Sequence, residues 1–469
     1  MLRVFCCALL LCGCAARVNA QANAQERNLG ADSQEGKGAD RDYPSTVPDW
    51  LVPVSDFNNN LPSWLRFDGQ FRDRLERFGN NAFKPQNDTH DLTQLRLMMI
   101  LQPTHWLTIV GETQDSRVFW NGYIAARPPY QNTWDIRQAY VQLGSLADGW
   151  VDAIAGREVL SLGEERLVGP SDWLNMGRTF DLARLDLHHS WFRLSLFASS
   201  VIVARDGVID HHNEGNNLHG AYGHLTRIVP AAVVEPYVLW RVAPATVHLS
   251  ENAGRGALNE VTVGFRAIGK VPGNFEYDVE MARQAGSLGP DSIDSWAGHW
   301  NIAKPLNGRL KPRPYLEANY ATGTKNPSSA NWGTFDQIYP SAHDKMDFAD
   351  QVGWRNIEQV RAGVSEAAAR KWKFTETYEN FWLASARDAL YAASGAPVAQ
   401  SATGSAGRHV GGEFDAWAEW GWKDAVALGF GYARFFTGRF LNRTTEGKDF
   451  NLPFVYLNYN FTPSTSPHK

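Results

Sequence analysis

The segment Leu65–Arg72, LRFDGQFR, alternates apolar and polar side chains, and this pattern decides the fold. Leu65, Phe67 and Phe71 fall on one face of an extended chain, and the charged residues between them fall on the other. A soluble sandwich would turn its polar face to the outside, whereas a large membrane barrel would turn it toward a wet lumen. Similar alternation recurs along the chain, for example at 261–267.

Counting such segments predicts an all-β chain that forms a transmembrane antiparallel β-barrel of about 18 strands. The predicted strands span 64–78, 92–102, 105–115, 134–144, 148–157, 183–189, 190–203, 218–228, 232–243, 257–269, 273–284, 293–304, 310–322, 354–365, 371–382, 410–422, 424–436 and 451–461. Their connections alternate strictly between tight turns and long irregular stretches, such as 158–182, 323–353 and 383–409. Outer-membrane barrels sort their connections in this way, with turns in the periplasm and long loops outside the cell.

The composition agrees with a barrel and excludes two other classes. Aromatic residues make up 12% of the 469 residues and Trp occurs 18 times, although mean hydropathy is −0.36. No apolar run approaches the roughly 20 residues of a membrane-spanning helix, whereas aromatic girdles are typical of outer-membrane barrels. The formal net charge of −5 argues against a nucleic-acid partner.

The ends of the chain predict export and assembly in a bacterial outer membrane. Residues 1–20 have the pattern of a secretory signal peptide, and they contain all four cysteines. A lipoprotein-like box ending at Cys14 leaves lipidation open as an alternative. Residues 21–60 are expected to be a flexible periplasmic lead-in, 61–461 the barrel and 462–469 a C-terminal tail. The last predicted strand ends on Phe461, a pattern that barrel-assembly machinery recognises.

Several motifs resemble the bacterial alginate-export family of outer-membrane porins. The longest is Arg166–Asp181, RLVGPSDWLNMGRTFD, which is similar to the family pattern Gly-Pro-x-Asp-Trp-x-Asn-x-x-Arg-x-Phe-Asp. The shorter motifs are Asp115-Ser116-Arg117, Arg137–Val141, Gly156-Arg157-Glu158, Thr334-Phe335-Asp336, Tyr339-Pro340 and Gly353–Asn356. The resemblance implies a monomeric 18-stranded barrel with an arginine-lined lumen, through which anionic polysaccharide leaves the periplasm.

Arginine is the side chain best suited to such a lumen, because its guanidinium binds carboxylates bidentately and stays charged. Alternation places several arginines inside, and two more belong to the family motifs or to the loop that follows strand 148–157. The predicted pore-lining residues are Arg66, Arg72, Arg74, Arg96, Arg157, Arg178, Arg193 and Arg241. We expect Arg157 to form a constriction and the charged loop 158–182 to fold inward. The plain alternative is that these side chains pair across strands and brace the wall.

The lumen is mixed in charge, because alternation also turns acids such as Glu379, Glu413 and Asp415 inward. The solute therefore stays open: an anionic polysaccharide for export, or small anionic or zwitterionic nutrients for uptake. A non-transport adhesin or a barrel enzyme are further alternatives. No motif suggests catalysis, a cofactor or a metal site, and His188-His189 and His211-His212 are interpreted as solvated turn and loop residues.

Overall fold

The computed structural model describes residues 57–144, 149–244, 256–368, 371–422 and 425–461. The predicted signal peptide, Cys14, the tail and all but the last four residues of the lead-in lie outside these ranges. Within them, one sheet of 19 strands contains 18 long antiparallel strands and one two-residue strand. Among the described residues, no helix is both long and apolar enough to cross a membrane.

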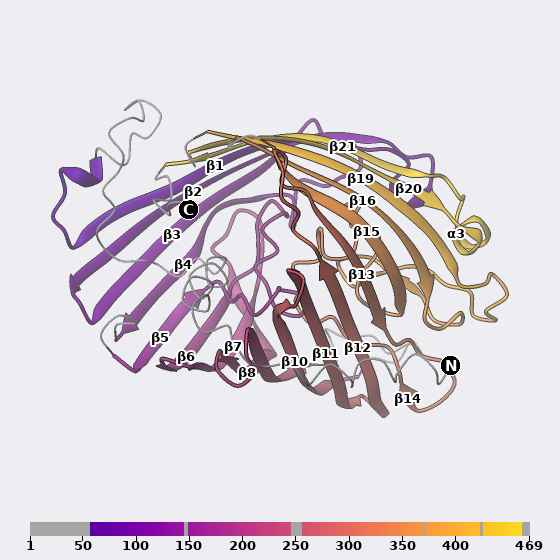
Figure 1. The fold of residues 1–469 in the computed structure, drawn as a ribbon, viewed down its shortest axis with the longest axis horizontal. Helices are drawn as coiled ribbons and strands as arrows, with labels where there is room; N and C mark the ends of the chain where they lie inside the picture. Colours follow the sequence, from indigo (N-terminus) through magenta and orange to yellow (C-terminus); the bar gives the residue numbers. More distant parts are fainter. Residues whose placement is uncertain (1–56, 145–148, 245–255, 369–370, 423–424, 462–469) are drawn as a thin grey trace. The chain divides into compact units, whose positions relative to one another are not determined.

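The long strands follow one another around the sheet in sequence order (Figure 1). They are β1 (Leu65–Phe78), β2 (Asp88–Thr104), β3 (Leu107–Phe119), β4 (Asn132–Leu143), β5 (Val151–Glu158), β6 (Phe180–His189), β7 (Phe192–Val203), β8 (His211–Leu225), β9 (Ala232–Ala243), β10 (Leu258–Val271), β11 (Phe275–Leu288), β12 (Asp291–Ala303), β13 (Arg313–Ala321), β15 (Ile357–Ala368), β16 (Trp372–Leu383), β19 (His409–Trp422), β20 (Val426–Thr437) and β21 (Phe450–Asn460).

The first and last strands pair with each other and close the barrel. β1 and β21 are antiparallel, with Gln70 opposite Asn460 and Glu76 opposite Phe454. Closure leaves no free edge in the sheet, which is the condition for a β-structure to span a membrane. The predicted 18-stranded antiparallel barrel is therefore confirmed.

Small elements lie in the connections, where no regular structure was predicted. They are η2 (Asn81–Phe83), β14 (Asn331–Trp332), β17 (Leu390–Tyr391), β18 (Pro397–Ala399) and α3 (Arg439–Thr444). β17 and β18 form a hairpin of their own, and β14 pairs in parallel with the start of β12.

The connections depart from the strict alternation predicted from the sequence, most clearly between β11 and β12. The link between β11 and β12 is only Gly289-Pro290, although it lies at the end of the barrel that carries the long connections. The long connection after β13 supplies β14, which pairs with β12 next to this turn. The connection after β13 thus covers the part of the rim that a longer connection between β11 and β12 would have covered.

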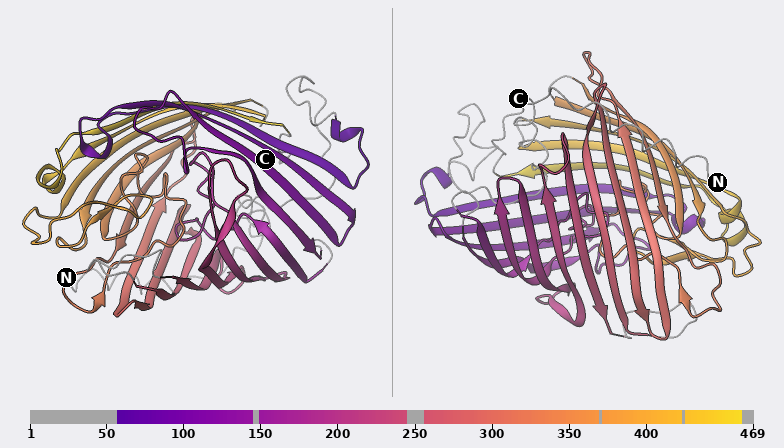
Figure 2. Two further views of the ribbon diagram at one scale, coloured as in Figure 1. Left: turned by 180° about the vertical axis from the view of Figure 1, so that it is seen from behind. Right: turned by 60° about the horizontal axis from the view of Figure 1, so that its bottom comes forward.

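Figure 2 shows the tilted strands of the wall from two further directions. Both faces of the wall follow the predicted alternation. Large apolar residues such as Leu97, Val263 and Phe430 are 42–53% exposed on the outer face, while alternate residues are buried inside. Near the short turns, four exposed tryptophans precede or begin strands: Trp64, Trp106, Trp150 and Trp191. Their position is typical of the aromatic girdle at a membrane interface.

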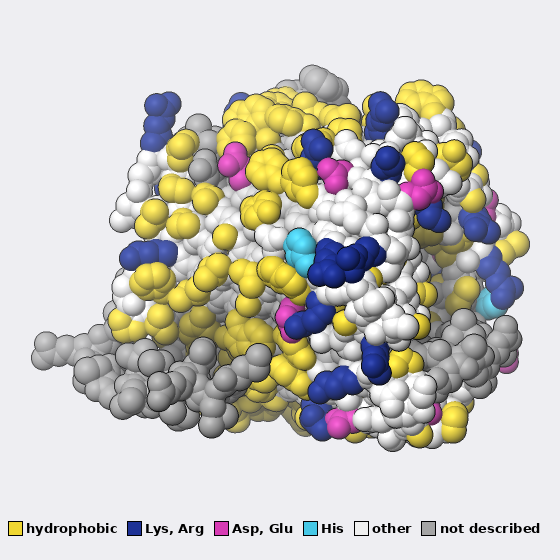
Figure 3. Space-filling view, turned by 90° about the vertical axis from the view of Figure 1, so that its right-hand side faces the viewer, with side chains coloured by type: hydrophobic (Ala, Val, Ile, Leu, Met, Phe, Trp, Pro, Cys, Tyr) yellow, Lys and Arg dark blue, Asp and Glu magenta, His cyan; other side chains and the backbone are white. Residues whose placement is uncertain are grey.

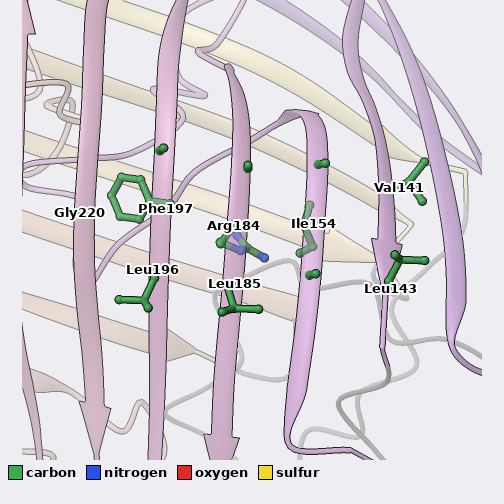
Figure 4. A pocket seen from close by; sticks show the side chains of 12 residues that line it. Val141, Leu143, Ile154, Arg184, Leu185, Leu196, Phe197 and Gly220 are labelled. Atoms are coloured by element: carbon green, nitrogen blue, oxygen red, sulfur yellow. The ribbon is translucent and has the colours of Figure 1, made fainter.

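A shallow apolar groove of about 520 Å³ lies across β4–β8 (Figure 4). Val141, Leu143, Leu185 and Leu196, which are 38–49% exposed, stand beside alanines that leave a depression in the wall. Because these leucines and this valine belong to the outward face, the groove is part of the lipid-facing surface. The passage through the protein must be sought inside the barrel.

Candidate functional site

Two long connections fold into the barrel, and they define the candidate site. The first inward loop, residues 159–179, joins β5 to β6, and the second inward loop, residues 322–356, joins β13 to β15. Figure 1 shows both among the strands of the ring, crossing the space between opposite walls. The predicted inward fold of the first loop is confirmed by its hydrogen bonds to lumenal side chains, described next.

Arginines of β1 hold the first inward loop through its backbone. Arg72 donates hydrogen bonds to the carbonyl oxygens of Asp172, at 2.6 Å, and Leu174, at 2.9 Å. Arg74 donates to the carbonyl oxygen of Trp173 at 2.6 Å, and its guanidinium lies 3.9 Å from the centre of the Trp173 ring. Arg74 is also paired with Glu76, at 2.6 Å, whereas Arg72 has no ion-pair partner among the described residues. Carbonyl oxygens accept from Arg72 without cancelling its charge, so the wall stays positive at Arg72.

Asn175 fixes the same loop to β2 and β3. Its side-chain amide donates to the carbonyl oxygens of Thr93 at 3.1 Å, Arg117 at 3.0 Å and Tyr130 at 2.8 Å. In return, side chains of the two strands donate to the carbonyl oxygen of Asn175: Gln94 and Ser116, each at 2.6 Å. Asn175 is 1% exposed, so these hydrogen bonds are shielded from water.

Asp172 brings a negative charge among the arginines. Its Oδ1 accepts hydrogen bonds from Arg96 at 2.9 Å and from Arg137 at 3.1 Å. Burial opposes ionisation, but Arg96 and Arg137 hold the pKa of Asp172 well below its ordinary value. The carboxylate therefore remains ionised, while its side chain is still 49% exposed to the lumen.

The two inward loops are bound to each other in the lumen. Gly169 N–H donates to the Tyr339 carbonyl oxygen at 2.9 Å, and Tyr339 N–H donates to that of Leu167 at 2.8 Å. Arg178 donates to the carbonyl oxygens of Gly169 at 3.2 Å and Pro340 at 3.0 Å. Burial lowers the pKa of Arg178 to about 10, which still leaves it charged at neutral pH.

An aromatic stack adds a second link between the loops. The rings of Trp173 and His343 lie parallel, with centroids 3.9 Å apart and an interplanar angle of 3°. Trp173 also meets Phe454 of β21 edge to face, at 5.2 Å. The stack therefore joins both loops to the seam where the barrel closes.

The second inward loop is held by the walls on either side of it. Arg241 of β9 forms an ion pair with Asp336, and Gln284 of β11 donates to the Asp336 carbonyl oxygen at 2.7 Å. Further along, Arg361 of β15 donates to the carbonyl oxygen of Met346 at 2.6 Å. Together the two loops form a bridge across the lumen, from β1–β4 to the β9–β11 and β15–β19 walls.

The predicted pore-lining arginines occupy three kinds of position. Four of them contact the inward loops from the wall, namely Arg72, Arg74, Arg96 and Arg241, and Arg178 belongs to the first inward loop and contacts the second. Arg66 and Arg193 are partly exposed near the short-turn ends of β1 and β7, and Arg66 donates to the carbonyl oxygens of Pro62 and Leu65.

Arg157 occupies the third kind of position, and it differs from the expectation. It alternates with Ile154 and Glu158, which are buried on the lumenal face, and so lies on the opposite face of β5. There it binds Asp181 at 2.9 Å and the carbonyl oxygens of Ile136 and Asp210. Its contacts join neighbouring strand ends at the long-loop side of the barrel.

Alternation alone missed Arg137, although it lies inside. The register between β3 and β4 shifts between Glu112 and Thr113, and both Arg137 and the adjacent Gln138 become buried. Both donate to Glu112 Oε2, at 2.7 and 2.6 Å. A β-bulge turns two consecutive side chains toward one face, which strict alternation cannot predict.

The comparisons with known proteins identify the family. The model of the alginate export family matches residues 63–452, nearly the whole described barrel. The chain belongs to the alginate export family. Members of this family are channels rather than enzymes, and this member is accordingly an outer-membrane β-barrel channel. No curated protein sequence matches it.

Solved structures support the fold of this family member. OccK11 (OpdR) of Pseudomonas aeruginosa superposes with a TM-score of 0.53 at 12% identity, over 84% of this chain and 95% of its own. OccAB2 of Acinetobacter baumannii superposes with a TM-score of 0.55 at 10% identity, over 84% of this chain and 97% of its own. At such identities the likeness concerns the barrel fold alone.

Proposed function

We propose that this member of the alginate export family is a passive channel for an anionic solute, with a uronate polysaccharide as the first candidate. The observation that carries the proposal is the way the lumenal arginines are satisfied. Among the described residues, Arg72 and Arg178 donate to backbone carbonyl oxygens and have no carboxylate within ion-pair distance. Their charge remains available to attract carboxylates that enter the lumen.

The rim of the barrel favours the same kind of solute. Figure 3 views the side on which α3 lies and shows Lys and Arg side chains spread over it. Exposed basic residues in this part of the chain are Arg387, Arg408, Arg439, Arg443 and Lys448, of which Arg408 is paired with Glu358. A basic rim raises the local concentration of anions at the mouth and speeds their entry at low salt.

Conductance across a planar bilayer tests the proposal. We expect a reversal potential that favours anions, and block of the current by polymannuronate but not by dextran of equal length. Arg72→Gln should weaken both effects, because it removes a lumenal charge without altering the outer surface. Absence of conductance would contradict the channel, and equal block by both polymers would contradict uronate selectivity.

A second candidate is uptake of small anionic or zwitterionic solutes. It is favoured by the bridge between the inward loops, because Gly169, Tyr339 and Ser341 join the loops where a polymer would have to pass. Block by glucuronate monomer at least as strong as block by the polymer would favour this function. Weak block by the monomer and strong block by the polymer would favour export.

We further propose that the channel acts as a monomer, without catalysis or cofactor, and that residues 1–20 are removed on export. Closure of β1 on β21 within one chain supports the monomer. Light scattering in detergent should give the mass of one chain, and mass spectrometry should find Gln21 at the mature N-terminus. The apolar, aromatic β21 supports recognition by barrel-assembly machinery, which copurification with and without residues 450–461 would test.

A further inference from the structure

A group of carboxylates lies inside the barrel where β16 and β19 meet the second inward loop. One carboxylate oxygen each of Glu379, Glu413 and Asp415 lies within 4.8 Å of the other two. Glu379 and Glu413 have no exposed surface, and Asp415 is 2% exposed. Glu379 and Glu413 are also direct partners in the β16–β19 register, where like charges repel.

Glu379 and Glu413 each use one oxygen and leave the other unsatisfied. Glu413 Oε1 accepts hydrogen bonds from the backbone N–H groups of Phe348 at 2.9 Å and Ala349 at 3.0 Å. Glu379 Oε2 accepts from Arg361 and from Gln359, the latter at 2.9 Å. Glu413 Oε2 and Glu379 Oε1 are buried and have no hydrogen-bond partner among the described residues.

Asp415 and Asp347 add three more oxygens of the same kind. Asp347 Oδ2 accepts from the N–H groups of Gln351 at 2.8 Å and Val352 at 3.1 Å, whereas its Oδ1 is buried without a partner in the described chain. Neither oxygen of Asp415 has one there. Burial, followed by the charges of Asp350 and Glu379, raises the pKa of Asp347 well above its ordinary value.

Neighbouring cations do not balance these charges. Arg361 is the cation in contact with Glu379, and its Nη1 is also 3.7 Å from Glu317 Oε2. A comparison is provided by a second carboxylate group, which includes Glu164 and Asp278. There Arg166 lies 2.7 Å from Glu164. A further arginine of β10 binds Asp278. That group has an arginine at Glu164 and another at Asp278, whereas the ion pairs of the described residues give the group at β16 and β19 only Arg361, which contacts Glu379.

We propose that Glu379, Glu413 and Asp415 bind a divalent cation, with Asp347 as the fourth carboxylate, and that the cation is Ca²⁺. Buried carboxylates with unused oxygens must be protonated, or must bind a cation. Ca²⁺ takes six to eight oxygen ligands at about 2.3–2.6 Å in adaptable geometry, and the three clustered residues together with Asp347 carry buried carboxylate oxygens without a hydrogen-bond partner among the described residues. The sequence motifs had predicted no metal site, because no spacing within one segment marks this group.

The position of the cation would give it a mechanical role. Asp347 belongs to the second inward loop, while Glu379, Glu413 and Asp415 belong to the wall. The cation would thus clamp the loop to β16 and β19, next to the hydrogen bonds from Phe348 and Ala349. Removing it would release that end of the loop and leave the contacts with the first inward loop in place.

Calcium binding to the folded barrel in detergent tests the proposal and does not depend on conduction. After dialysis against EDTA, titration with CaCl₂ should show saturable binding of one ion per chain and a raised melting temperature. Asp415→Asn and Glu413→Gln should each weaken binding at least tenfold, because each removes a charged ligand. Glu280→Gln is the matched control, since Glu280 is also a buried lumenal acid but binds Tyr237 instead.

Two results would overturn the proposal. The first is no saturable binding by the folded wild-type barrel, or binding unchanged by Asp415→Asn. The second is a melting temperature in EDTA that rises in both variants while calcium has no effect, which would mean that the carboxylates share protons. Heat-modifiable migration on gels establishes that each variant has folded, and Glu413→Asp, which keeps the charge, replaces any variant that has not.

Discussion

The wall at β1–β4 and the wall at β16–β19 both meet an inward loop, but they meet it with opposite charge. At β1–β4, arginines donate to backbone carbonyl oxygens of the first inward loop, as Arg72 does to Asp172 and Leu174. At β16–β19, carboxylates receive N–H groups from the second inward loop, yet Asp415 receives none from the described residues. The difference shows that the carbonyl oxygens of a loop can pair with a guanidinium more completely than the N–H groups of a loop can pair with a group of carboxylates.

Replacing Arg361, the arginine at the acidic wall formed by β16 and β19, should have the largest effect on stability. Arg361→Met leaves Glu379 and Glu317 without their partner, and breaking a buried ion pair costs about 3–5 kcal/mol. Urea unfolding in detergent measures the loss. The control is Arg313→Met, whose partner Glu276 is partly exposed, and where we expect less than about 1 kcal/mol. Equal losses at both sites would show that the acidic wall has no special dependence on Arg361.

Releasing the first inward loop from the basic wall at β1–β4 should have the second-largest effect, which is on conductance. Asn175→Ala removes hydrogen bonds to three carbonyl oxygens, each with a net contribution of about 0.5–1.5 kcal/mol. We expect a loop that leaves the wall and a larger single-channel conductance. Asn326→Ala, at an exposed position of the second inward loop, should not change the conductance. A conductance unchanged by Asn175→Ala would mean that the first loop does not limit the current.

The charge of Asp172 should have a smaller effect that depends on pH. Its pKa is lowered in the folded protein, so its contribution is complete above the unfolded value of about 3.9 and is lost as pH falls below it. Asp172→Asn should therefore lower the melting temperature at pH 7, and by less at pH 3, where part of the contribution has been lost. The effect should be modest, since the side chain is 49% exposed. A difference between variant and wild type that is as large at pH 3 as at pH 7 would exclude ionisation as its cause.

The smallest effect on selectivity is expected at Arg157. Because it lies on the face of β5 opposite to Glu158, Arg157→Gln should shift the reversal potential much less than Arg72→Gln does. Measurements in a tenfold KCl gradient compare the two variants directly. A shift at Arg157 as large as that at Arg72 would restore the sequence-based expectation of a constriction there.

The architecture was predictable from the sequence because it depends on short-range regularity. Alternation located each long strand, since every lipid-facing position needs an apolar side chain over the whole height of the membrane. The exceptions are local: the bulge that buries both Arg137 and Gln138, and the two-residue turn at Gly289-Pro290. Neither changes the number of strands.

The candidate site was less predictable, because it depends on contacts between distant segments. The motif around Asp172 and Asn175 indicated an important loop, but not that Asn175 binds β2 and β3. Likewise, Glu413 and Asp415 were expected inside, while their approach to Glu379 and to Asp347 depends on the register of two strands and the path of a loop. Such positions follow from the whole fold and are not encoded in any one segment.

The pairing of β1 with β21 has a consequence for biogenesis. β1 pairs with β21, which consists of residues 450–460, so the seam cannot form until synthesis is nearly complete. An unfinished sheet would expose two rows of unpaired N–H and C=O groups, which hydrocarbon does not tolerate. The chain must therefore cross the periplasm unfolded and insert as its ends come together. Barrel assembly is then an all-or-none event.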